Sequence, residues 1–541
     1  MPITRSILTT AAEHPDRPAI VGETSALTYA ELAEDGRRVI AAVRHLLAQA
    51  PNLPTPAPET QGAPVIAVSS TSAFEAARIM AGLAGYRAVS ATIDPRWPVD
   101  HQRHVIAEVG IGVVIVDDDE AEARLRSALG PDWGGVVVPM QRFREIEARV
   151  QPAEPPQVRD ASEPYLMLFS SGTTSSPKAF LKTRGQYRAN FAVSSRYLEP
   201  LPGVATLAPG AFAYSLTLYA TVECLASGGE AHLADELSLP GLGQRVAQQR
   251  ITRIVTVPAV LRGLIAQATR RPEDFAGLEL IVVGGANLPN ALREDLHRVL
   301  PHVRLISYYG AAEIGFIGDA RGDDSTWNQI YDGVQVEIRD DAGHPVPDGE
   351  IGTLWVLADS RSDDYIAGTA DVHLLDEHGW ATVGDQGRAA VVGGERQLQL
   401  LGRKDDIINV GGHKVALPGV TRAYAGLTVA GKHREAVAVG LPDTALGTAV
   451  ALVIEAGELV PADSGGSVCA DSREQNGPAQ ALGEQLSKAA LREHGRARLA
   501  PQFIPTKYYA VKALPRTVGG KVRTAETVKL IQAGGKGVVR L

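Results

Sequence analysis

The chain has 541 residues, of which 45% are hydrophobic and 21% are charged, a composition typical of a globular protein with several domains or subdomains. Its formal net charge of -9 argues against a nucleic-acid partner, because nucleic-acid-binding proteins usually present a basic face. No apolar run reaches the roughly 18 residues that a membrane span needs, and two cysteines are too few for a disulfide framework or a zinc cluster.

The first residues, Met1–Arg5, lack the apolar core of a signal peptide, so we expect a soluble cytoplasmic protein. Strand and helix patterns then alternate over about 150 residues. Leu27–Leu32 is typical of a strand end followed by a capped helix start, and the helical run Ala73–Gly85 lies between the apolar runs Val65–Val68 and Val113–Val116. This alternation predicts parallel sheets covered by helices. The proline-containing stretch 50–64 predicts a loop.

The next predicted strand, Tyr165–Phe169, is followed by a turn with six hydroxyl residues, Ser170-Ser171-Gly172-Thr173-Thr174-Ser175-Ser176-Pro177-Lys178. Backbone N–H groups and hydroxyls in such a turn can converge on one anion, and Lys178 adds a positive charge at its rim. A proline precedes the lysine where a Walker loop has glycine, so P-loop NTPase chemistry is disfavoured. The turn predicts a phosphate-binding loop, with an ordinary surface Ser/Thr turn as the alternative.

Further strands are predicted at Ile254–Val257 and Leu280–Val283, and from about residue 334 the pattern changes to shorter strands such as Val336–Ile338 and Gly352–Val356. Residues 461–478 are rich in Ser, Gly, Asp and Ala and predict a flexible insertion in a C-terminal domain.

Four later motifs fit nucleotide chemistry. Tyr308–Glu313 joins aromatic rings to a carboxylate across an expected glycine turn; an aromatic ring can stack on a purine, and a carboxylate beside phosphates usually works through Mg²⁺. Gly384-Asp385 places an acid on a predicted turn, where it can accept ribose hydroxyls. Gly402–Asp406 is a charged run, and Leu514–Arg523 carries Lys521 on a glycine-rich loop.

In this order and at these spacings, the motifs resemble those of the adenylate-forming superfamily, which groups acyl- and aryl-CoA synthetases, nonribosomal-peptide adenylation domains and luciferases. The resemblance runs from about residue 10 to the C-terminus. It implies an α/β fold, with a large N-terminal domain of parallel-sheet subdomains and a β-rich subdomain over residues 1–401. A hinge at 402–406 and a small mobile α+β C-terminal domain at 407–541 would follow. ATP and Mg²⁺ are the implied cofactors.

The resemblance also implies roles for individual residues. Lys521 would bridge the carboxylate and the α-phosphate, Glu313 would assist Mg²⁺ together with Thr174, and Asp405 would be the hinge. The implied cofactor-binding residues are Ser170, Ser171, Gly172, Thr173, Thr174, Lys178, Gly285, Ala286, Tyr308, Tyr309, Gly310, Ala311, Asp385 and Arg403. The implied substrate pocket contains Phe212, Ala213, Tyr214, Gly284 and Gly285.

Each role has a simpler alternative. Glu313 can be an ordinary carboxylate at the start of a helix, and Asp385 can be a turn residue that bonds its own backbone. Lys521 can be a solvated loop lysine, and residues 403–406 can be one exposed charge run.

Two departures from the family pattern bear on activity. Ala312 and Val383 each stand where the family usually has threonine, and a lost hydrogen bond to a charged group is worth about 1.5–3 kcal/mol. A degenerate nucleotide-binding protein with weak activity is therefore an alternative function.

The segment Phe212-Ala213-Tyr214 concerns the substrate. Adenylation domains for α-amino acids hold the ammonium with an aspartate, and here Ala213 occupies that position. An unpaired buried ammonium is costly, so an α-amino acid is disfavoured. The segment is more similar to that of benzoate-type CoA ligases, which favours an aryl or short apolar acid. The alternative is that Phe212 and Tyr214 only pack the wall.

The predicted function is ATP-dependent conversion of a carboxylic acid to acyl-AMP with release of pyrophosphate, followed by transfer to a thiol. The acceptor would be CoA or the pantetheine arm of a carrier protein. An amide synthetase, which transfers the acyl group to an amine, is the alternative within enzymes.

Overall fold

The computed structural model describes residues 3–50, 52–170, 177–235, 239–285, 288–320, 327–403, 406–410, 413–429, 432–443, 447–457, 486–499, 503–517, 521–534 and 537–541. The chain divides into two compact units. Unit 1 comprises residues 1–337, 355–383 and 395–397, and unit 2 comprises residues 338–354, 384–394 and 398–541. The domain limits at 401 and 407 stay a prediction. The insertion predicted at 461–478 lies outside the described residues.

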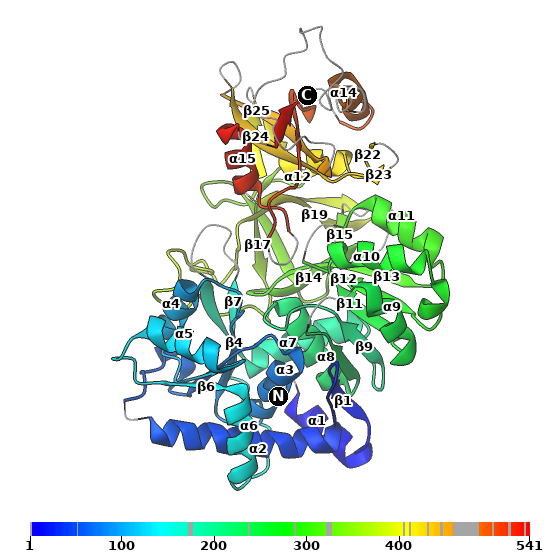
Figure 1. The fold of residues 1–541 in the computed structure, drawn as a ribbon. Helices are drawn as coiled ribbons and strands as arrows, with labels where there is room; N and C mark the ends of the chain where they lie inside the picture. The colour runs from blue at the N-terminus through cyan, green and yellow to red at the C-terminus, as the bar shows by residue number, and fades with distance from the viewer. Residues whose placement is uncertain are drawn as a thin grey trace. The chain divides into compact units, whose positions relative to one another are not determined.

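The first sheet of unit 1 has the strand order β6-β5-β3-β4-β7-β8 (Figure 1). Its strands are β3 (Val65–Ser69), β4 (Val89–Thr92), β5 (Val113–Val116), β6 (Val136–Pro139), β7 (Pro164–Ser170) and β8 (Lys178–Thr183). The first five are parallel, and β8 returns antiparallel to β7. The associated helices are α3 (Ala73–Leu83), α4 (Val99–Val109), α5 (Asp119–Leu129) and α6 (Met140–Arg149). The predicted parallel sheet is confirmed, because buried apolar runs alternate with amphipathic helices along the chain.

The predicted capped helix start is also confirmed. Helix α2 (Tyr29–Gln49) follows β2 (Ala26–Thr28), and Thr28 and Glu31 form a reciprocal capping box. The Glu31 backbone N–H donates to Thr28 Oγ1 at 3.2 Å, and the Thr28 N–H donates to Glu31 Oε2 at 2.9 Å. These two bonds satisfy N–H groups that have no partner within the helix.

The second sheet has 13 strands, of which nine neighbouring ones in unit 1 have the order β15-β14-β13-β12-β11-β9-β10-β1-β2. The remaining strands of these nine are β1 (Pro18–Val21), β9 (Ala205–Ala208), β10 (Glu230–Leu233), β11 (Arg253–Thr256), β12 (Leu280–Val283), β13 (Arg304–Ala311), β14 (Gly315–Ala320) and β15 (Trp327–Ile330). The strands from β13 to β1 are parallel, and antiparallel partners continue the sheet at both ends. The helices of this part are α1 (Thr4–Glu13), α7 (Arg184–Tyr197), α8 (Ser215–Ser227), α9 (Leu239–Gln248), α10 (Pro258–Ala268) and α11 (Asn290–Val299).

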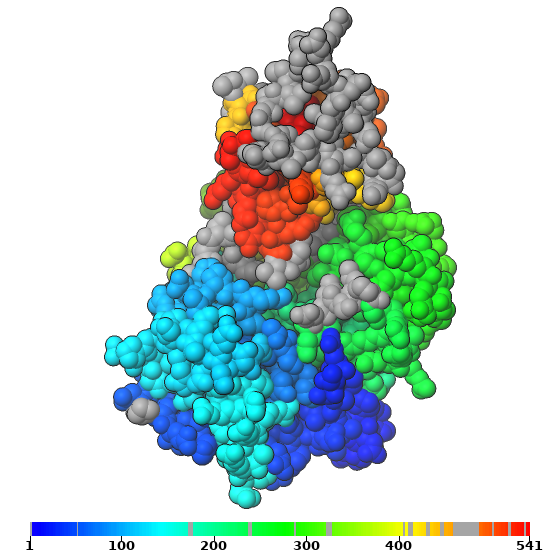
Figure 2. All heavy atoms as spheres, viewed as in Figure 1, coloured from blue at the N-terminus to red at the C-terminus, as the bar shows by residue number. Residues whose placement is uncertain are grey.

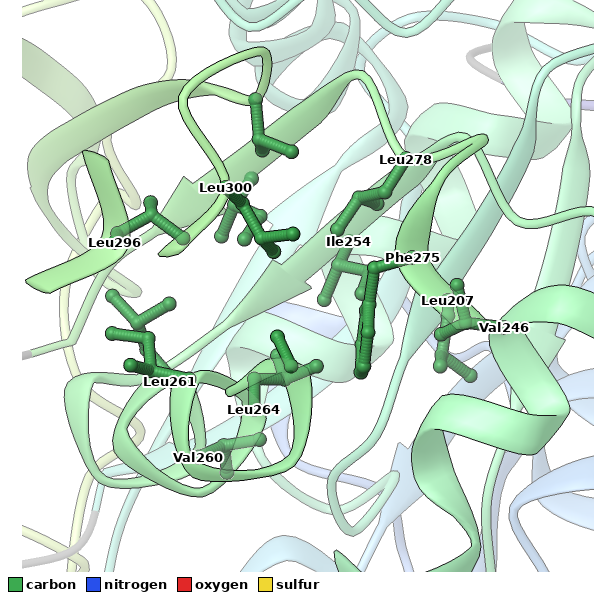
Figure 3. Close-up of a cluster of buried hydrophobic side chains, with 14 of the residues drawn as sticks. Leu207, Val246, Ile254, Val260, Leu261, Leu264, Phe275, Leu278, Leu296 and Leu300 are labelled. Carbon is green, nitrogen blue, oxygen red and sulfur yellow. The ribbon is translucent and has the colours of Figure 1, made fainter. Parts of the chain in front are cut away.

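Leucine, isoleucine and phenylalanine side chains fill the space between this sheet and helices α9, α10 and α11 (Figure 3). Ile254 and Leu207 point from the strands, Leu261 and Leu264 point from α10, and Phe275 closes the cluster from the connection before β12. In Figure 2 the cyan residues over the first sheet and the green residues over the second form different parts of the surface of unit 1.

Unit 2 contains a four-stranded sheet of order β24-β25-β26-β27 and two short hairpins, β20-β21 and β22-β23. Its strands are β20 (Ile407–Val410), β21 (His413–Ala416), β22 (Thr428–Val429), β23 (Lys432–His433), β24 (Ala436–Asp443), β25 (Gly447–Glu455), β26 (Lys507–Val511) and β27 (Val538–Arg540). Its helices are α12 (Leu417–Ala423), α14 (Lys488–Arg496) and α15 (Thr524–Ala533). Tyr424 and Tyr508 are fully buried in its core.

The chain passes between the units within β16 (Gln335–Arg339), β17 (Gly352–Leu357) and β19 (Glu395–Arg403), and also just before β18 (Asp385–Val392) and just before β19. The predicted short strands at 336–338 and 352–356 are thereby confirmed. Two 3-10 helices, Pro58–Thr60 and Pro272–Phe275, complete the elements named here. Within the described residues, no helix combines the length and the apolar character needed to traverse a membrane.

Candidate functional site

The predicted phosphate loop connects two paired strands. Strand β7 ends at Ser170, strand β8 begins at Lys178, and these two residues face each other in the antiparallel register. The ends of the loop are therefore neighbours on the edge of the first sheet. Residues 171–176, which include Ser171, Gly172, Thr173 and Thr174, lie outside the described residues.

The tyrosine Tyr365 lies against the start of β8. The Lys178 ammonium stands 4.9 Å from the centroid of the Tyr365 ring, and the Phe180 ring meets it edge-on at 6.3 Å. Phe180 and Tyr365 also form an isolated antiparallel bridge. A lysine over a tyrosine face is attracted by the ring quadrupole, so Tyr365 attracts the Lys178 cation at the end of the predicted phosphate loop. Tyr365 was not predicted from the sequence, because no motif includes it.

Glu313 contacts the hydroxyl group of this tyrosine. Its side chain is buried, and Tyr365 Oη donates to its Oε1 at 3.3 Å. Glu313 belongs to the turn between β13 and β14, so the alternative of a helix start is wrong. Lys178 and Glu313, which are 135 positions apart in the sequence, therefore contact one tyrosine ring from two segments.

The turn itself differs from the expectation. Gly310 lies within β13, opposite Phe316, and the chain reverses at residues 312–314. A Cβ on Gly310 would lie 2.5 Å from the Gly315 carbonyl oxygen, so the two strands approach too closely for a side chain there. Gly310 therefore allows β13 and β14 to approach closely, and the turn comes after it in the chain.

Lys182 is a buried lysine that bonds to the turn, and it too was not predicted from the sequence. Lys182 Nζ donates to the Glu313 carbonyl oxygen at 2.8 Å and to the Ser360 carbonyl oxygen at 2.7 Å. Burial lowers the pKa of Lys182 to about 7, against the opposing attraction of Glu313 and Asp363. The alternation of side chains along a strand could have indicated Lys182, because Lys178, Phe180 and Lys182 share one face of β8.

Tyr308 fills the space above Gly284. A Cβ on Gly284 would lie 2.1 Å from Tyr308 Cζ, so the ring requires a glycine at this position. Tyr308 also meets the Phe316 ring edge-on at 4.8 Å, and Phe316 in turn meets Tyr219 of α8 at 4.9 Å. Three aromatic rings thus connect Gly284 to helix α8. The adjacent Gly285 has φ = +78°, and Ala286 lies outside the described residues.

The predicted substrate segment precedes α8. Phe212 is buried, Ala213 is half-buried, and Tyr214 is the N-cap residue of the helix. The Arg96 guanidinium lies 5.6 Å from the centroid of the Tyr214 ring, and Arg96 is held by two bonds of 2.8 and 2.9 Å to the buried Asp94 carboxylate. Burial raises the pKa of the Tyr214 phenol.

Two predicted nucleotide-binding residues meet in unit 2. Asp385 is the first residue of β18, after Gly384 with φ = +82°, and Arg403 is the last residue of β19. Arg403 Nε lies 3.5 Å from Asp385 Oδ1, which places a cation and a carboxylate side by side at the ends of these strands. Asp405, the predicted hinge, lies outside the described residues.

Lys521 closes a turn elsewhere in unit 2. Its N–H donates to Thr517 Oγ1 at 3.1 Å, and the Thr517 N–H donates to the Lys521 carbonyl at 2.7 Å. Its side chain is exposed. Arg516, at the base of this turn, binds Glu435 at 3.0 Å and Glu455 at 2.8 Å. The base of the turn is therefore anchored to the four-stranded sheet.

Comparison with known proteins identifies relatives. The family model described as AMP-binding enzyme matches residues 7–365. The chain is 25% identical to the uncharacterized acyl–CoA ligase YhfT of Bacillus subtilis (strain 168), over 98% of this chain and 99% of that protein.

Two solved structures share the fold. The anthranilate CoA ligase AuaEII in complex with anthranoyl-AMP has a TM-score of 0.79 at 15% identity, covering 98% of this chain and 96% of that one. The amide bond synthetase McbA from Marinactinospora thermotolerans has a TM-score of 0.75 at 22% identity, covering 98% of each chain. The predicted fold class is confirmed by these likenesses.

Proposed function

The chain belongs to the AMP-binding enzyme family, and we propose that it activates a small aryl or apolar carboxylic acid with ATP. The products of this step are an acyl-AMP and pyrophosphate, and the acyl group then passes to a thiol of CoA or of a carrier protein. One observation supports the proposal most: Lys178, at the end of the predicted phosphate loop, and Glu313 both contact Tyr365.

The chemistry of these groups fits a magnesium-bound polyphosphate. Glu313 supplies a carboxylate, the ligand type that Mg²⁺ prefers, and Lys178 supplies a cation for phosphate oxygens. Glu313 and Thr174 would hold the Mg²⁺, which would neutralise charge on the phosphates when bound. Tyr309 would stack on adenine, while Asp385 and Arg403 would bind ribose and phosphate.

The first step brings two anions together, since a carboxylate oxygen attacks the α-phosphorus and pyrophosphate leaves. Lys521 would lie between the carboxylate and the α-phosphate and reduce their repulsion, an electrostatic contribution that a positioned cation supplies without reorganisation. In the second step the thiol sulfur attacks the acyl carbon and AMP leaves. Rotation about Asp405 would withdraw Lys521 between the steps, a movement of known type.

The packing around Tyr308 supports a small acid. Its ring lies directly on Gly284, a residue of the predicted substrate pocket, and Phe316 and Tyr219 back it. A long acyl chain entering past Gly284 would have to displace this ring. An aryl or short apolar acid can instead lie against its face.

Replacing Tyr308 by alanine is therefore expected to broaden the substrate range. We expect the ratio of kcat/KM for a two-ring acid to that for benzoate to rise about 10–100-fold, since shape differences in an apolar pocket discriminate by roughly this factor. The measurement is acid-dependent pyrophosphate release over a graded series of acids. Tyr197→Ala is the control, because Tyr197 stacks on Tyr331 at 4.2 Å and is outside the predicted pocket. An unchanged ratio in Tyr308→Ala would show that this ring does not limit the acid.

ATP–pyrophosphate exchange over a panel of aryl and aliphatic acids tests the proposed function. We expect at least one small aryl or apolar acid to stimulate exchange well above the acid-free rate, and α-amino acids to remain near it. ATP binding without exchange by any acid would instead establish the degenerate nucleotide-binding protein, the alternative suggested by Ala312 and Val383.

An amide synthetase is a second candidate, supported by the fold shared with McbA. With the activating acid known, the enzyme is supplied with CoA and, separately, with a set of amines, and the products are identified by mass spectrometry. An acyl-CoA product supports thiol transfer. An amide formed faster than the uncatalysed reaction of acyl-AMP, with no thioester, supports the amide synthetase.

A further inference from the structure

Lys182 is only 2% exposed, and among the described residues its ammonium forms no ion pair with a carboxylate. Instead it donates to two backbone carbonyls, those of Glu313 and Ser360. These residues lie 131 and 178 positions further along the chain. One buried cation therefore joins β8, the turn after β13 and the segment that leads to Tyr365.

Other bonds tie the same two segments together. The Ser360 hydroxyl donates to the Ile314 carbonyl at 2.8 Å, and the Ser362 N–H donates to the Glu313 carbonyl at 2.8 Å. Gly315 follows with φ = +113°, and a Cβ there would lie 2.5 Å from Ser360 Oγ. We call Lys182, Ser360 and Ser362 the turn clasp, because their bonds converge on residues 313 and 314.

A hydrophobic side chain would fill the position of Lys182 without the cost of desolvating a charge, which amounts to several kcal/mol per buried ion. The compensating interactions come from the two carbonyls and from the carboxylates of Glu313 and Asp363. Asp363 is itself held by Gln186, whose Nε2 donates to it at 3.0 Å. All of these partners lie in the turn at 312–314 or in the segment 360–365. The Lys182 ammonium is therefore stabilised by this particular arrangement of the two segments.

We propose that Lys182 is a positioning residue that sets the location of the Glu313 carboxylate and of Tyr365 relative to Lys178 on β8. This inference rests on the proposed function, in which Glu313 assists Mg²⁺ and Lys178 binds phosphate. Lys182 acts through the Glu313 main chain and touches no substrate. Without it, the turn at 312–314 loses its hydrogen bond to β8 but keeps its bonds to Ser360 and Ser362, so the spacing between Glu313 and Lys178 is less firmly fixed.

The test compares Lys182→Met with Arg184→Met. Arg184 is the matched control, since its buried guanidinium also donates to two carbonyls, those of Ala84 and Tyr86, away from the turn clasp. Hydrogen exchange followed by mass spectrometry is measured on peptides covering 310–318 and 358–366. Lys182→Met is expected to accelerate exchange there at least tenfold, whereas Arg184→Met is expected to accelerate it around residues 84–88 only. Equal effects of the two variants on 310–318, or none from Lys182→Met, would overturn the proposal.

The affinity for ATP, measured by calorimetry once with Mg²⁺ and once with excess chelator, tests whether the turn clasp affects nucleotide binding. Lys182→Met is expected to weaken Mg·ATP binding about tenfold and metal-free ATP binding less than threefold, and Arg184→Met should change neither.

Should Lys182→Met not fold, Ser360→Ala removes only the hydroxyl bond to Ile314 and is expected to give smaller changes in the same peptides. If wild-type protein binds no Mg·ATP, the proposed function fails, while the exchange data still decide whether Lys182 holds the turn. Equal weakening with and without Mg²⁺ would also contradict the positioning role.

Discussion

Replacing Lys521 by alanine is expected to lower the rate of acyl-adenylate formation by about 10²–10³-fold, the loss typical for one positioned group that stabilises developing charge. The reason is that attack of a carboxylate on the α-phosphate requires a cation between two anions. The measurement is single-turnover formation of acyl-AMP with the activating acid. KM for ATP should change much less, because Lys178 and the phosphate loop would still bind the nucleotide.

The fold should survive this change. The Lys521 side chain is exposed, and the bonds that close its turn come from its backbone, which alanine retains. Lys512→Ala is the control, since Lys512 is an exposed lysine of the same unit outside that turn. Its rate of adenylation should remain within about twofold of wild type.

The rate of the second step distinguishes a catalytic role of Lys521 from a purely structural one. With chemically prepared acyl-AMP and CoA, thioester formation by Lys521→Ala should proceed at close to the wild-type rate, because in the proposed mechanism Lys521 would be withdrawn in that step. Equal losses in both steps would contradict the assigned role, and an unchanged first step would return Lys521 to the alternative of a solvated loop lysine.

Replacing Arg78 by methionine is expected to destabilise the first part of unit 1 by about 3–5 kcal/mol, the usual cost of removing one partner from a buried ionic cluster. Arg78 lies on α3 and is fully buried. Its guanidinium contacts Glu75 at 2.8 Å, Glu147 of α6 at 2.9 Å and Asp35 of α2 at 3.2 Å. Helix α2 contacts both α3 and α6, and α6 crosses α2 in Figure 1. The variant leaves three carboxylates around a site where Arg144 supplies the nearest remaining cation.

The electrostatics of this cluster agree with that expectation. Burial by itself lowers the pKa of Arg78, but Asp35 and Glu147 outweigh it and the net shift is upward. Burial raises the pKa of Glu147 although Arg78 opposes the shift. Without Arg78, Glu147 would lose the principal interaction that keeps it ionised inside the protein.

Thermal and urea unfolding of Arg78→Met should show a first transition lowered by on the order of 10 °C. Arg149→Met is the comparison, because Arg149 pairs with Glu145 on the exposed face of α6 at 3.6 Å, and surface pairs contribute at most about 1 kcal/mol. If both variants shifted the transition equally, the buried cluster would have no special role in stability.

Much of the fold was predictable from local patterns. The capping residues Thr28 and Glu31 marked the start of α2, and the apolar run 113–116 matched β5 residue for residue. The prediction for β11 was displaced by one residue, because Val257 serves as the N-cap of α10, which begins at Pro258. Burial and periodicity dominate in these elements, and both can be counted in the sequence.

The candidate site was predictable only in part. Glu313 and Lys178 stood out because their residue types recur in nucleotide chemistry, while Tyr365 and Lys182 did not. A tyrosine in an acidic loop and a lysine in a strand are ordinary in a sequence. Their contacts depend on which face of β8 meets the segment 360–366, and this is a property of packing.

The sequence alone determined several strands of the two parallel sheets, the start of α2, the order of the motifs and the family that they resemble, because hydrophobic periodicity and capping act over a few residues. The tertiary structure alone decided that Lys178 and Glu313 share Tyr365, that Lys182 holds the turn from below, and that Tyr308 requires Gly284. Such contacts join segments more than a hundred residues apart, or adjacent parallel strands in a specific register. Their geometry follows from the close packing of the whole unit, which no local pattern encodes.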